Sequence, residues 1–131
     1  KVKIMSASEH DQILSLTSHL PHVIAYNIVK TSMSNGDKLK GDIIRYSAGG
    51  LRDFTRIAAS DPVMWKDIFI DNSDLIIRAI ENFIKNLTEF KIAIQEKDSK
   101  KLLDIFIKSK EFREEIIKAG QDTDKPDFGR K

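Results

Sequence analysis

The stretch Ser8–Val29, SEHDQILSLTSHLPHVIAYNIV, decides the fold, because it predicts one long helix around a central proline. Ile13, Leu16 and Leu20 recur at steps of three and four, which is helical periodicity. Beyond Pro21 the helix is apolar on nearly every side, as is typical of a buried helix. Proline has no N–H to donate to the preceding turn, so we expect a kink or break at Pro21.

Start and stop signals divide the rest of the chain into further helices. Ser8 and Asp11 are spaced as a capping box, which places the first helix start at about residue 9. Asp61 as N-cap and Pro62 as first helical residue predict a later start. The other expected elements are a helix end before 34–37, a segment of open form at 39–46, a hinge or tight turn at 48–50, and helices over 51–58 and 61–71. Asn72 or Ser73 is expected to cap the longest helix, whose apolar stripe reaches Ile94, and Asp98 or Ser99 to start a final helix that reaches Ile116.

These elements predict an all-α fold. The last two helices are joined by a short turn, so we expect them to form an antiparallel pair behind the long kinked first helix. We expect residues 8–119 to form the helical domain and residues 120–131 a flexible tail. Residues 1–7 read as a linker or as the end of a preceding domain.

Composition narrows the classes of function. The 131 residues suit one domain, and 22 Lys+Arg against 20 Asp+Glu leave a net charge of +2, which gives no reason to expect a nucleic-acid or membrane partner. No apolar run approaches the roughly 20 residues of a membrane span. The absence of cysteine excludes disulfides and thiolate sites and fits a cytoplasmic location.

The polar residues around Pro21 are the first candidate site. On a helical wheel Ser18 and His22 lie one turn apart, away from the main apolar stripe, and could face a cleft together. They could equally be surface residues or satisfied core groups. His10 and His19 lie elsewhere on the wheel, and their spacing does not support a metal site.

A second candidate site follows Gly49. Arg52 and Arg56 are four residues apart, so one helix face would present two guanidinium groups suited to a carboxylate or phosphate. The alternative is a solvated face with an intrahelical pair between Asp53 and Arg56. Trp65 reads more readily as a core residue than as a ligand contact. No GxGxxG or Walker loop is present, so the residues alone indicate an all-α domain with a cationic site for a small anion.

The runs SEHDQILSLTSHLPHVIAYNIV and AGGLRDFTRIAASDPVMWKDIFIDN resemble the C-terminal helical domain of prephenate dehydrogenases, including cyclohexadienyl and arogenate dehydrogenases. The resemblance extends over roughly residues 1–90. The elements that match are His10-Asp11, residues 18–22, Gly49-Gly50, residues 52–58, Ser60-Asp61-Pro62, Met64-Trp65, Asp67-Ile68 and Asn72.

The resemblance implies an NAD(P)-dependent oxidative decarboxylation of prephenate to 4-hydroxyphenylpyruvate, in tyrosine biosynthesis. It implies that a separate N-terminal domain binds NAD or NADP, and that this helical domain binds substrate and forms a homodimer. The fragment alone is then expected to be inactive, and no catalytic residue is expected in it.

The resemblance also assigns roles to residues. Arg56 matches an arginine that binds a substrate carboxylate. His22, Ser18, Arg52 and Trp65 match further residues of the substrate site. Asp53 and the Gly49 backbone, with His10 and His19, match positions of an ionic network or of structural importance. The substrate, prephenate or arogenate, stays open, as does a non-catalytic helical dimerisation module.

Overall fold

The structure is a computed structural model that describes residues 3–34 and 36–122. Every regular element within these ranges is helical, which confirms the predicted all-α fold. The elements in chain order are α1 (Ala7–Leu14), the π-helical turn η1 (Ser15–His19), α2 (Leu20–Met33), α3 (Asp37–Arg45), α4 (Gly49–Ala58), α5 (Pro62–Asp71), α6 (Ser73–Gln95) and α7 (Ser99–Lys118).

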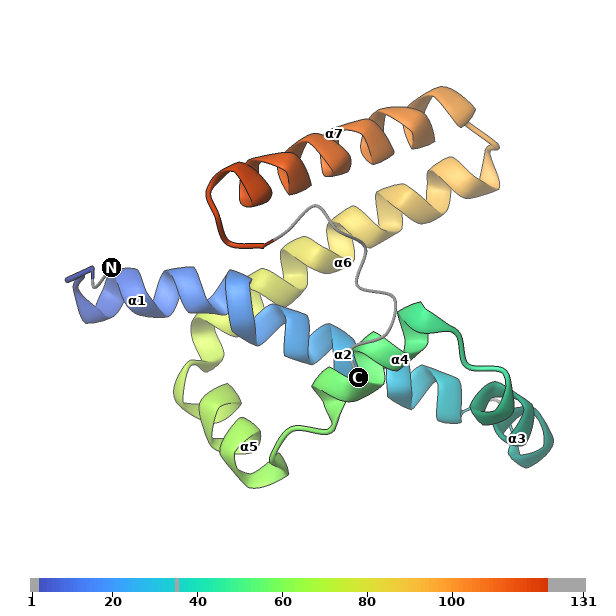
Figure 1. The fold of residues 1–131 in the computed structure, drawn as a ribbon, viewed down its shortest axis with the longest axis horizontal. Coiled ribbons are helices and arrows are strands. Elements are labelled where there is room, and N and C mark those ends of the chain that lie inside the picture. The colour runs from blue at the N-terminus through green and yellow to red at the C-terminus, as the bar shows by residue number, and fades with distance from the viewer. Residues whose placement is uncertain (1–2, 35, 123–131) are drawn as a thin grey trace. The chain divides into compact units, whose positions relative to one another are not determined.

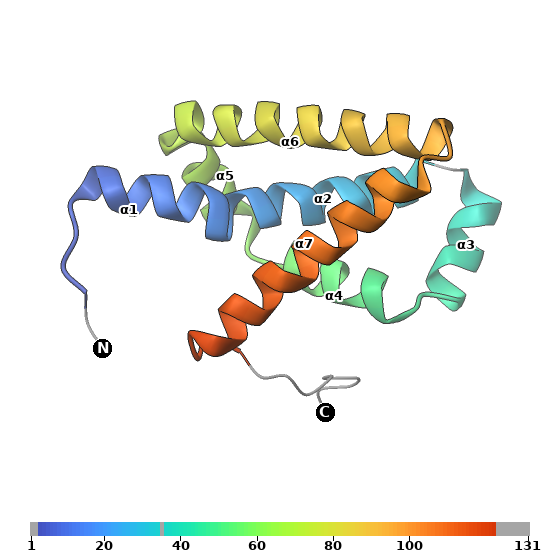
Figure 2. The same ribbon diagram turned by 90° about the horizontal axis from the view of Figure 1, so that it is seen from above.

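The chain forms two compact units, one up to Asn82 and one from Phe83 onward. In the first unit α1, η1 and α2 follow one another along a single line (Figure 2), and α2 packs beside α4 (Figure 1). Its buried side chains include Ala25 of α2 and Trp65 of α5. This unit contains all the residues of the two candidate sites.

The start of α1 differs from the prediction. Ser6, not Ser8, is the N-cap: its hydroxyl accepts a hydrogen bond from the N–H of Glu9 at 3.2 Å, and the Glu9 carboxylate accepts from the N–H of Ser6 at 2.9 Å. The bond from the Ser6 N–H, and a second one from the Ser6 hydroxyl to the same carboxylate at 2.9 Å, hold the pKa of Glu9 below its ordinary value. The predicted box from Ser8 to Asp11 was wrong because Ser6 and Glu9 have the same spacing two residues earlier. Residues 3–6 belong to no regular element.

Three other local predictions have clear outcomes. The segment 39–46, whose form the sequence left open, lies largely in helix α3. The predicted helix start at Asp61 and Pro62 is confirmed by the 2.7 Å hydrogen bond from the N–H of Met64 to the Asp61 carboxylate. The hinge or turn expected at Gly49 and Gly50 was wrong, because both glycines form the first turn of α4. Glycine is tolerated there because the first turn of a helix is its least constrained part.

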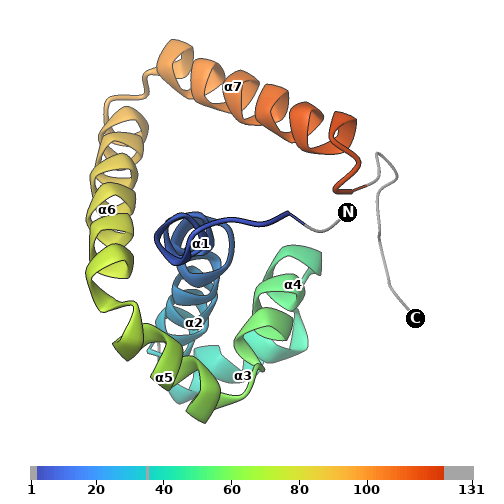
Figure 3. The same cartoon turned by 90° about the vertical axis from the view of Figure 1, so that its left-hand side faces the viewer.

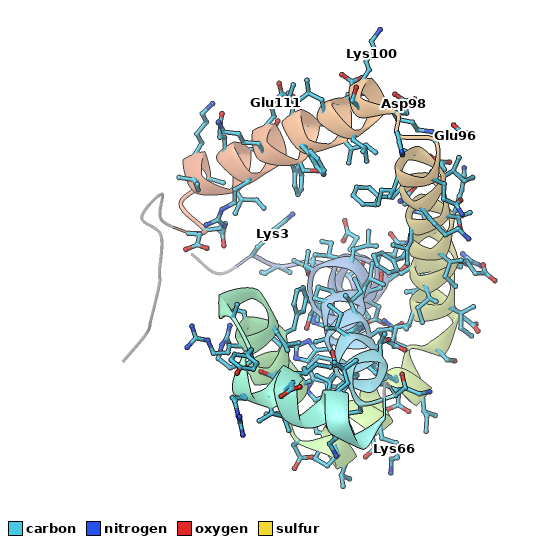
Figure 4. The ribbon with its side chains drawn as sticks, turned by 90° about the vertical axis from the view of Figure 1, so that its right-hand side faces the viewer. Lys3, Lys66, Glu96, Asp98, Lys100 and Glu111 are labelled. Atoms are coloured by element: carbon cyan, nitrogen blue, oxygen red, sulfur yellow. The ribbon has the colours of Figure 1, made fainter. Side chains whose placement is uncertain are left out.

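The second unit contains the end of α6, a tight turn and α7. Glu96 and Asp98 lie in that turn (Figure 4), and Asp98 caps α7 by accepting from the N–H of Lys101 at 2.9 Å. The chain reverses there as predicted, but the two helices diverge from the turn (Figure 3). Near it the rings of Phe90 and Phe106 lie 6.1 Å apart.

The C-terminal residues are described only up to residue 122. Gly120 has a φ of 73°, and the N–H of Gln121 bonds to the carbonyl of Ile116, so α7 ends in a left-handed cap. Arg113 and Asp122 form an ion pair at 2.9 Å just beyond this cap. The remainder of the predicted tail, residues 123–131, lies outside the described residues.

None of the helices in the described ranges combines the length and the apolar character that a membrane crossing requires.

Candidate functional site

A π-helical turn lies immediately before Pro21. The N–H of Leu20 bonds to the carbonyl of Ser15, five residues back, instead of to that of the fourth residue back. Pro21 has no N–H, and its ring would crowd the preceding turn of a regular α-helix, so a wider turn relieves both problems. The helical run therefore continues through Pro21 with a π-turn, in place of the kink or break that was predicted. The turn buries Ser15 and His19, whose exposed fractions are 4% and 8%.

His19 is held by the side chain of Asn72, which follows α5. The Asn72 amide nitrogen Nδ2 lies 3.2 Å from Nδ1 of His19 and 3.4 Å from the backbone carbonyl oxygen of Asp11. A carbonyl can only accept, so the amide must turn its N–H groups toward both partners. Nδ1 of His19 is then the acceptor, which makes the ring the neutral Nε2–H tautomer.

The surroundings of His19 favour this neutral form. Burial lowers the pKa of His19 below its ordinary value, as do the neighbouring His22 and His10, and these effects outweigh the attraction of Asp11, which raises it. Protonation would also turn an N–H of His19 toward the N–H of Asn72. His19 is thus a buried ring whose Nδ1 has a hydrogen-bond partner, and its structural role stays a prediction.

His22 lies flat on Trp65. The ring centroids are 3.5 Å apart and the planes differ by 18°, and we call this pair the His22–Trp65 stack. Nδ1 of His22 donates to the backbone carbonyl of Ser18 at 2.9 Å, so the neutral ring has its free lone pair on Nε2. No hydrogen bond or ion pair among the described residues involves that Nε2 atom. The hydrogen bond between these two residues therefore involves the Ser18 backbone and not its hydroxyl, and whether the two side chains face one cleft stays a prediction.

The position of Trp65 follows from the start of α5. Asp61 and Pro62 fix the first turn of the helix, and Trp65 lies one turn later with 7% of its surface exposed. Its indole contacts the rings of His19 and Phe69 at centroid distances of 6.1 Å and 5.6 Å, both steeply inclined. Trp65 is accordingly a core residue, and His22 is the half-buried ring that covers it.

The two candidate arginines lie on α4. Arg56 is 62% exposed and its guanidinium lies 4.0 Å from the carboxylate of Asp53, so the predicted intrahelical pair is present but weak in water. Arg52 is exposed as well. No hydrogen bond or ion pair joins either arginine to Ser18 or His22, although α4 packs on α2. Whether the four side chains meet around one ligand stays a prediction.

The remaining candidates are less enclosed. His10 is exposed, with Nδ1 3.0 Å from the carboxylate of the neighbouring Asp11. Gly49 begins α4, whose N-cap residue Ala48 provides no side-chain cap, and a Cβ at Gly49 would meet no atom within 4 Å. Within residues 3–34 and 36–122, no three His, Asp or Glu side chains come together to hold a metal ion.

Two features of the site were not predicted. The π-turn had a signal in Pro21, but sequence does not reveal whether a proline kinks, breaks or widens a helix. Asn72 was predicted as a possible cap of α6. Its backbone carbonyl does accept from the N–H of Ile76 at 3.1 Å, but its side chain turns back to His19.

Comparison with known proteins identifies the domain. The sequence model of the family described as "Prephenate dehydrogenase, dimerization domain" matches residues 6–108. Cyclohexadienyl dehydrogenase of Zymomonas mobilis is 42% identical over 86% of this chain and 39% of that protein. Prephenate dehydrogenase of Bacillus subtilis is 34% identical over 84% of this chain and 29% of that protein.

Solved structures of related dehydrogenases have the same fold as this chain. Prephenate dehydrogenase from Aquifex aeolicus, in complex with hydroxyphenyl propionate and NAD+, has a TM-score of 0.81 and 39% identity, covering 88% of this chain and 40% of that one. Arogenate dehydrogenase of Synechocystis has the same fold, with a TM-score of 0.81 at 16% identity.

The fold and these matches define an all-α dimerization domain of the kind found in dehydrogenases. The chain belongs to the prephenate dehydrogenase dimerization-domain family. It spans less than half the length of the relatives that it matches.

Proposed function

We propose that this chain is the substrate-binding and dimerisation part of an NAD(P)-dependent prephenate dehydrogenase. The observation that carries the proposal is the match to that family over residues 6–108, together with 34–42% identity to dehydrogenases named for this chemistry. The reaction is the oxidative decarboxylation of prephenate to 4-hydroxyphenylpyruvate. The ring loses a hydride and carbon dioxide and becomes a phenol.

The contribution of this chain is to bind and orient the substrate. Prephenate carries two carboxylates, so its site needs fixed cations, and the exposed Arg52 and Arg56 on one helix can provide them. The uncapped N-terminus of α4 at Gly49 adds free N–H groups that favour an anion. The ligand in the Aquifex aeolicus structure, hydroxyphenyl propionate, combines a phenol ring with one carboxylate, which suits a site with both cations and a flat ring such as His22.

The oxidation needs a nicotinamide dinucleotide as hydride acceptor. The residues present do not fit such a group: the described ranges contain no strand, and the sequence has no GxGxxG loop. NAD or NADP would therefore be held by residues outside this sequence. The helical domain would supply substrate orientation and charge complementarity beside it.

Dimerisation is the second half of the proposal. Large apolar side chains of α6 and α7 beyond residue 82 are more than half exposed, namely Ile84, Leu87, Ile94, Leu103, Phe106 and Phe112. A monomer in water rarely exposes so many apolar side chains along two helices. A second copy of the chain, as in the family's name, would cover them.

Arogenate is the alternative substrate. The relative with 42% identity is named a cyclohexadienyl dehydrogenase, so a broader substrate range is a specific alternative to prephenate alone. Prephenate and arogenate differ at a keto against an amino group on the side chain. Parallel assays with both substrates decide between them.

The test is Arg56→Ala in the full-length enzyme. We expect the KM for prephenate to rise about ten- to hundredfold, because one charge-assisted hydrogen bond is worth about 1.5–3 kcal/mol, with the KM for the dinucleotide nearly unchanged. Lys66→Ala is the matched control, because Lys66 is an exposed cation that projects from α5 (Figure 4). An unchanged KM in Arg56→Ala, or an equal rise in both variants, would refute the role of Arg56.

A further inference from the structure

Asn72 connects three parts of the first unit through one amide. Its Nδ2 atom reaches Nδ1 of His19 in η1 and the carbonyl oxygen of Asp11 in α1, while its backbone stands between α5 and α6. The two N–H groups of the amide match the two acceptors. Replacing the amide with a group that cannot donate would leave both acceptors in a partly buried place without their partner.

The orientation of His19 in turn affects the rings of Trp65 and His22. With its Nδ1 occupied, the ring can turn only by breaking the hydrogen bond, and in that orientation it stands edge-on to Trp65 at an interplanar angle of 81°. The Trp65 indole in turn carries the His22 ring at 3.5 Å. The four side chains thus form a connected series from Asn72 to His22.

The two histidines are fixed in opposite tautomers. His19 accepts at Nδ1 from the Asn72 amide, whereas His22 donates from Nδ1 to the Ser18 carbonyl. The Nε2 of His19 then carries a proton, whereas the Nε2 of His22 is left as an acceptor with no hydrogen bond among the described residues. The series therefore ends in one acceptor nitrogen on a ring that stacks on Trp65.

We propose that Asn72 is a positioning residue of the substrate site, which holds the His22–Trp65 stack in place by fixing the orientation and tautomer of His19. This inference rests on the proposed function, because it takes the stack to contact the substrate. The Asn72 amide is turned to His19 and to the Asp11 carbonyl, so its replacement would affect substrate binding through His22.

The first test uses Asn72→Asp, which keeps the shape of the side chain but removes both donors. Nitrogen NMR of the 131-residue chain at neutral pH should give a proton-free Nδ1 at His19 in the original protein and a protonated Nδ1 in the variant. Asn82→Asp is the matched control, since Asn82 is exposed on α6 and its variant should leave His19 unchanged. An unchanged His19 in Asn72→Asp would overturn the inference.

The second test is a double-mutant cycle in the full-length enzyme. Asn72→Asp should raise the KM for prephenate about tenfold with kcat within about twofold, and His22→Ala should do likewise. In the double variant the two effects should fall well short of their product, because both act through one ring. Multiplicative effects, or a kcat loss without a KM change, would assign Asn72 to stability alone.

The two tests separate the possible failures. If His22→Ala leaves the KM for prephenate unchanged, the proposed substrate site is wrong, whatever the NMR result. If His22→Ala raises the KM but Asn72→Asp does not, only the positioning role is wrong. Should Asn72→Asp fail to fold, Asn72→Ser takes its place, since its hydroxyl can donate to one of the two acceptors, and its rise in KM should be smaller than that of His22→Ala.

Discussion

At the scale of single residues, the two histidines near Pro21 differ in burial and in hydrogen bonding. His19 is buried and neutral, and its Nδ1 accepts from Asn72. His22 is half-buried, and its Nε2 has no partner among the described residues. Only their neighbours distinguish them, because the two rings lie three positions apart on one helical run and are chemically identical.

The buried state of His19 predicts a pH dependence of stability. Its pKa is lowered in the folded chain, so the unfolded chain binds the proton more tightly, and the free energy of unfolding must fall as pH drops. The contribution is complete above the ordinary histidine pKa of about 6.5 and is lost as pH falls below it, with a slope of at most about 1.4 kcal/mol per pH unit. Urea unfolding of the original protein and of His19→Gln between pH 5 and 8 measures this contribution. We expect the free energy of unfolding of the original protein to fall more steeply with decreasing pH than that of the variant.

The control for this prediction is His10→Gln, because His10 is exposed. This variant should lose stability with falling pH as the original protein does. A His19→Gln variant with the same pH dependence as the original would show that His19 is not held neutral.

At the scale of elements, the π-turn joins two α-helical segments that would otherwise be one regular helix. A π-turn contains one residue more than the α-helical turn that it replaces, so it rotates α1 about the helix axis relative to α2. That rotation brings the carbonyl of Asp11 to the Asn72 amide while His22 faces Trp65. The turn therefore sets the register between the polar contacts of α1 and the aromatic contacts of α2.

Inserting one alanine after Thr17 tests this role. The π-turn already holds one extra residue, so a further one should turn α1 by about 100° relative to α2. Far-UV circular dichroism should then keep its helical signal, while the free energy of unfolding falls by about 1–3 kcal/mol, since the hydrogen bond from Asn72 to Asp11 and the burial of Ser15 are lost.

Thr17→Ala is the length-matched control, because it removes only the exposed side chain. It should change the free energy of unfolding far less than the insertion. Equal stability of the insertion variant and the original protein would mean that the π-turn sets no register.

At the scale of the whole molecule, the apolar faces of α6 and α7 carry the proposed dimer. Leu87 is 53% exposed and Leu103 is 58% exposed, and each stands on a helix of the second unit. Burying such side chains against a second copy would release water from apolar surface and stabilise the assembly.

Replacing both leucines with lysine should dissociate the dimer. Light scattering at micromolar concentration should give twice the 14.9 kDa chain mass for the original protein and a single chain mass for Leu87→Lys/Leu103→Lys. Lys85→Ala, which removes an exposed cation from the same helix, is the control and should stay dimeric. A monomeric original protein would contradict the proposed dimer.

The sequence by itself determined the helices and most of their ends. Asp61 with Pro62, and Asp98 before α7, are local signals, because a cap and the N–H groups that it satisfies lie within one turn of each other. The same signals misplaced one start by two residues, where Ser6 and Glu9 repeat the spacing of Ser8 and Asp11. The spacing of a capping box can be read from sequence, but more than one pair of residues can have that spacing.

Only the tertiary structure decided what the polar side chains contact. The hydrogen bond between Asn72 and His19 joins residues 53 positions apart, and the His22–Trp65 stack likewise joins two distant helices. Periodicity placed Ser18 and His22 on one helix face, but it did not reveal that the ring of His22 stacks on Trp65. Such contacts depend on how helices pack and on the extra residue of a π-turn, and neither leaves a periodic trace in the sequence.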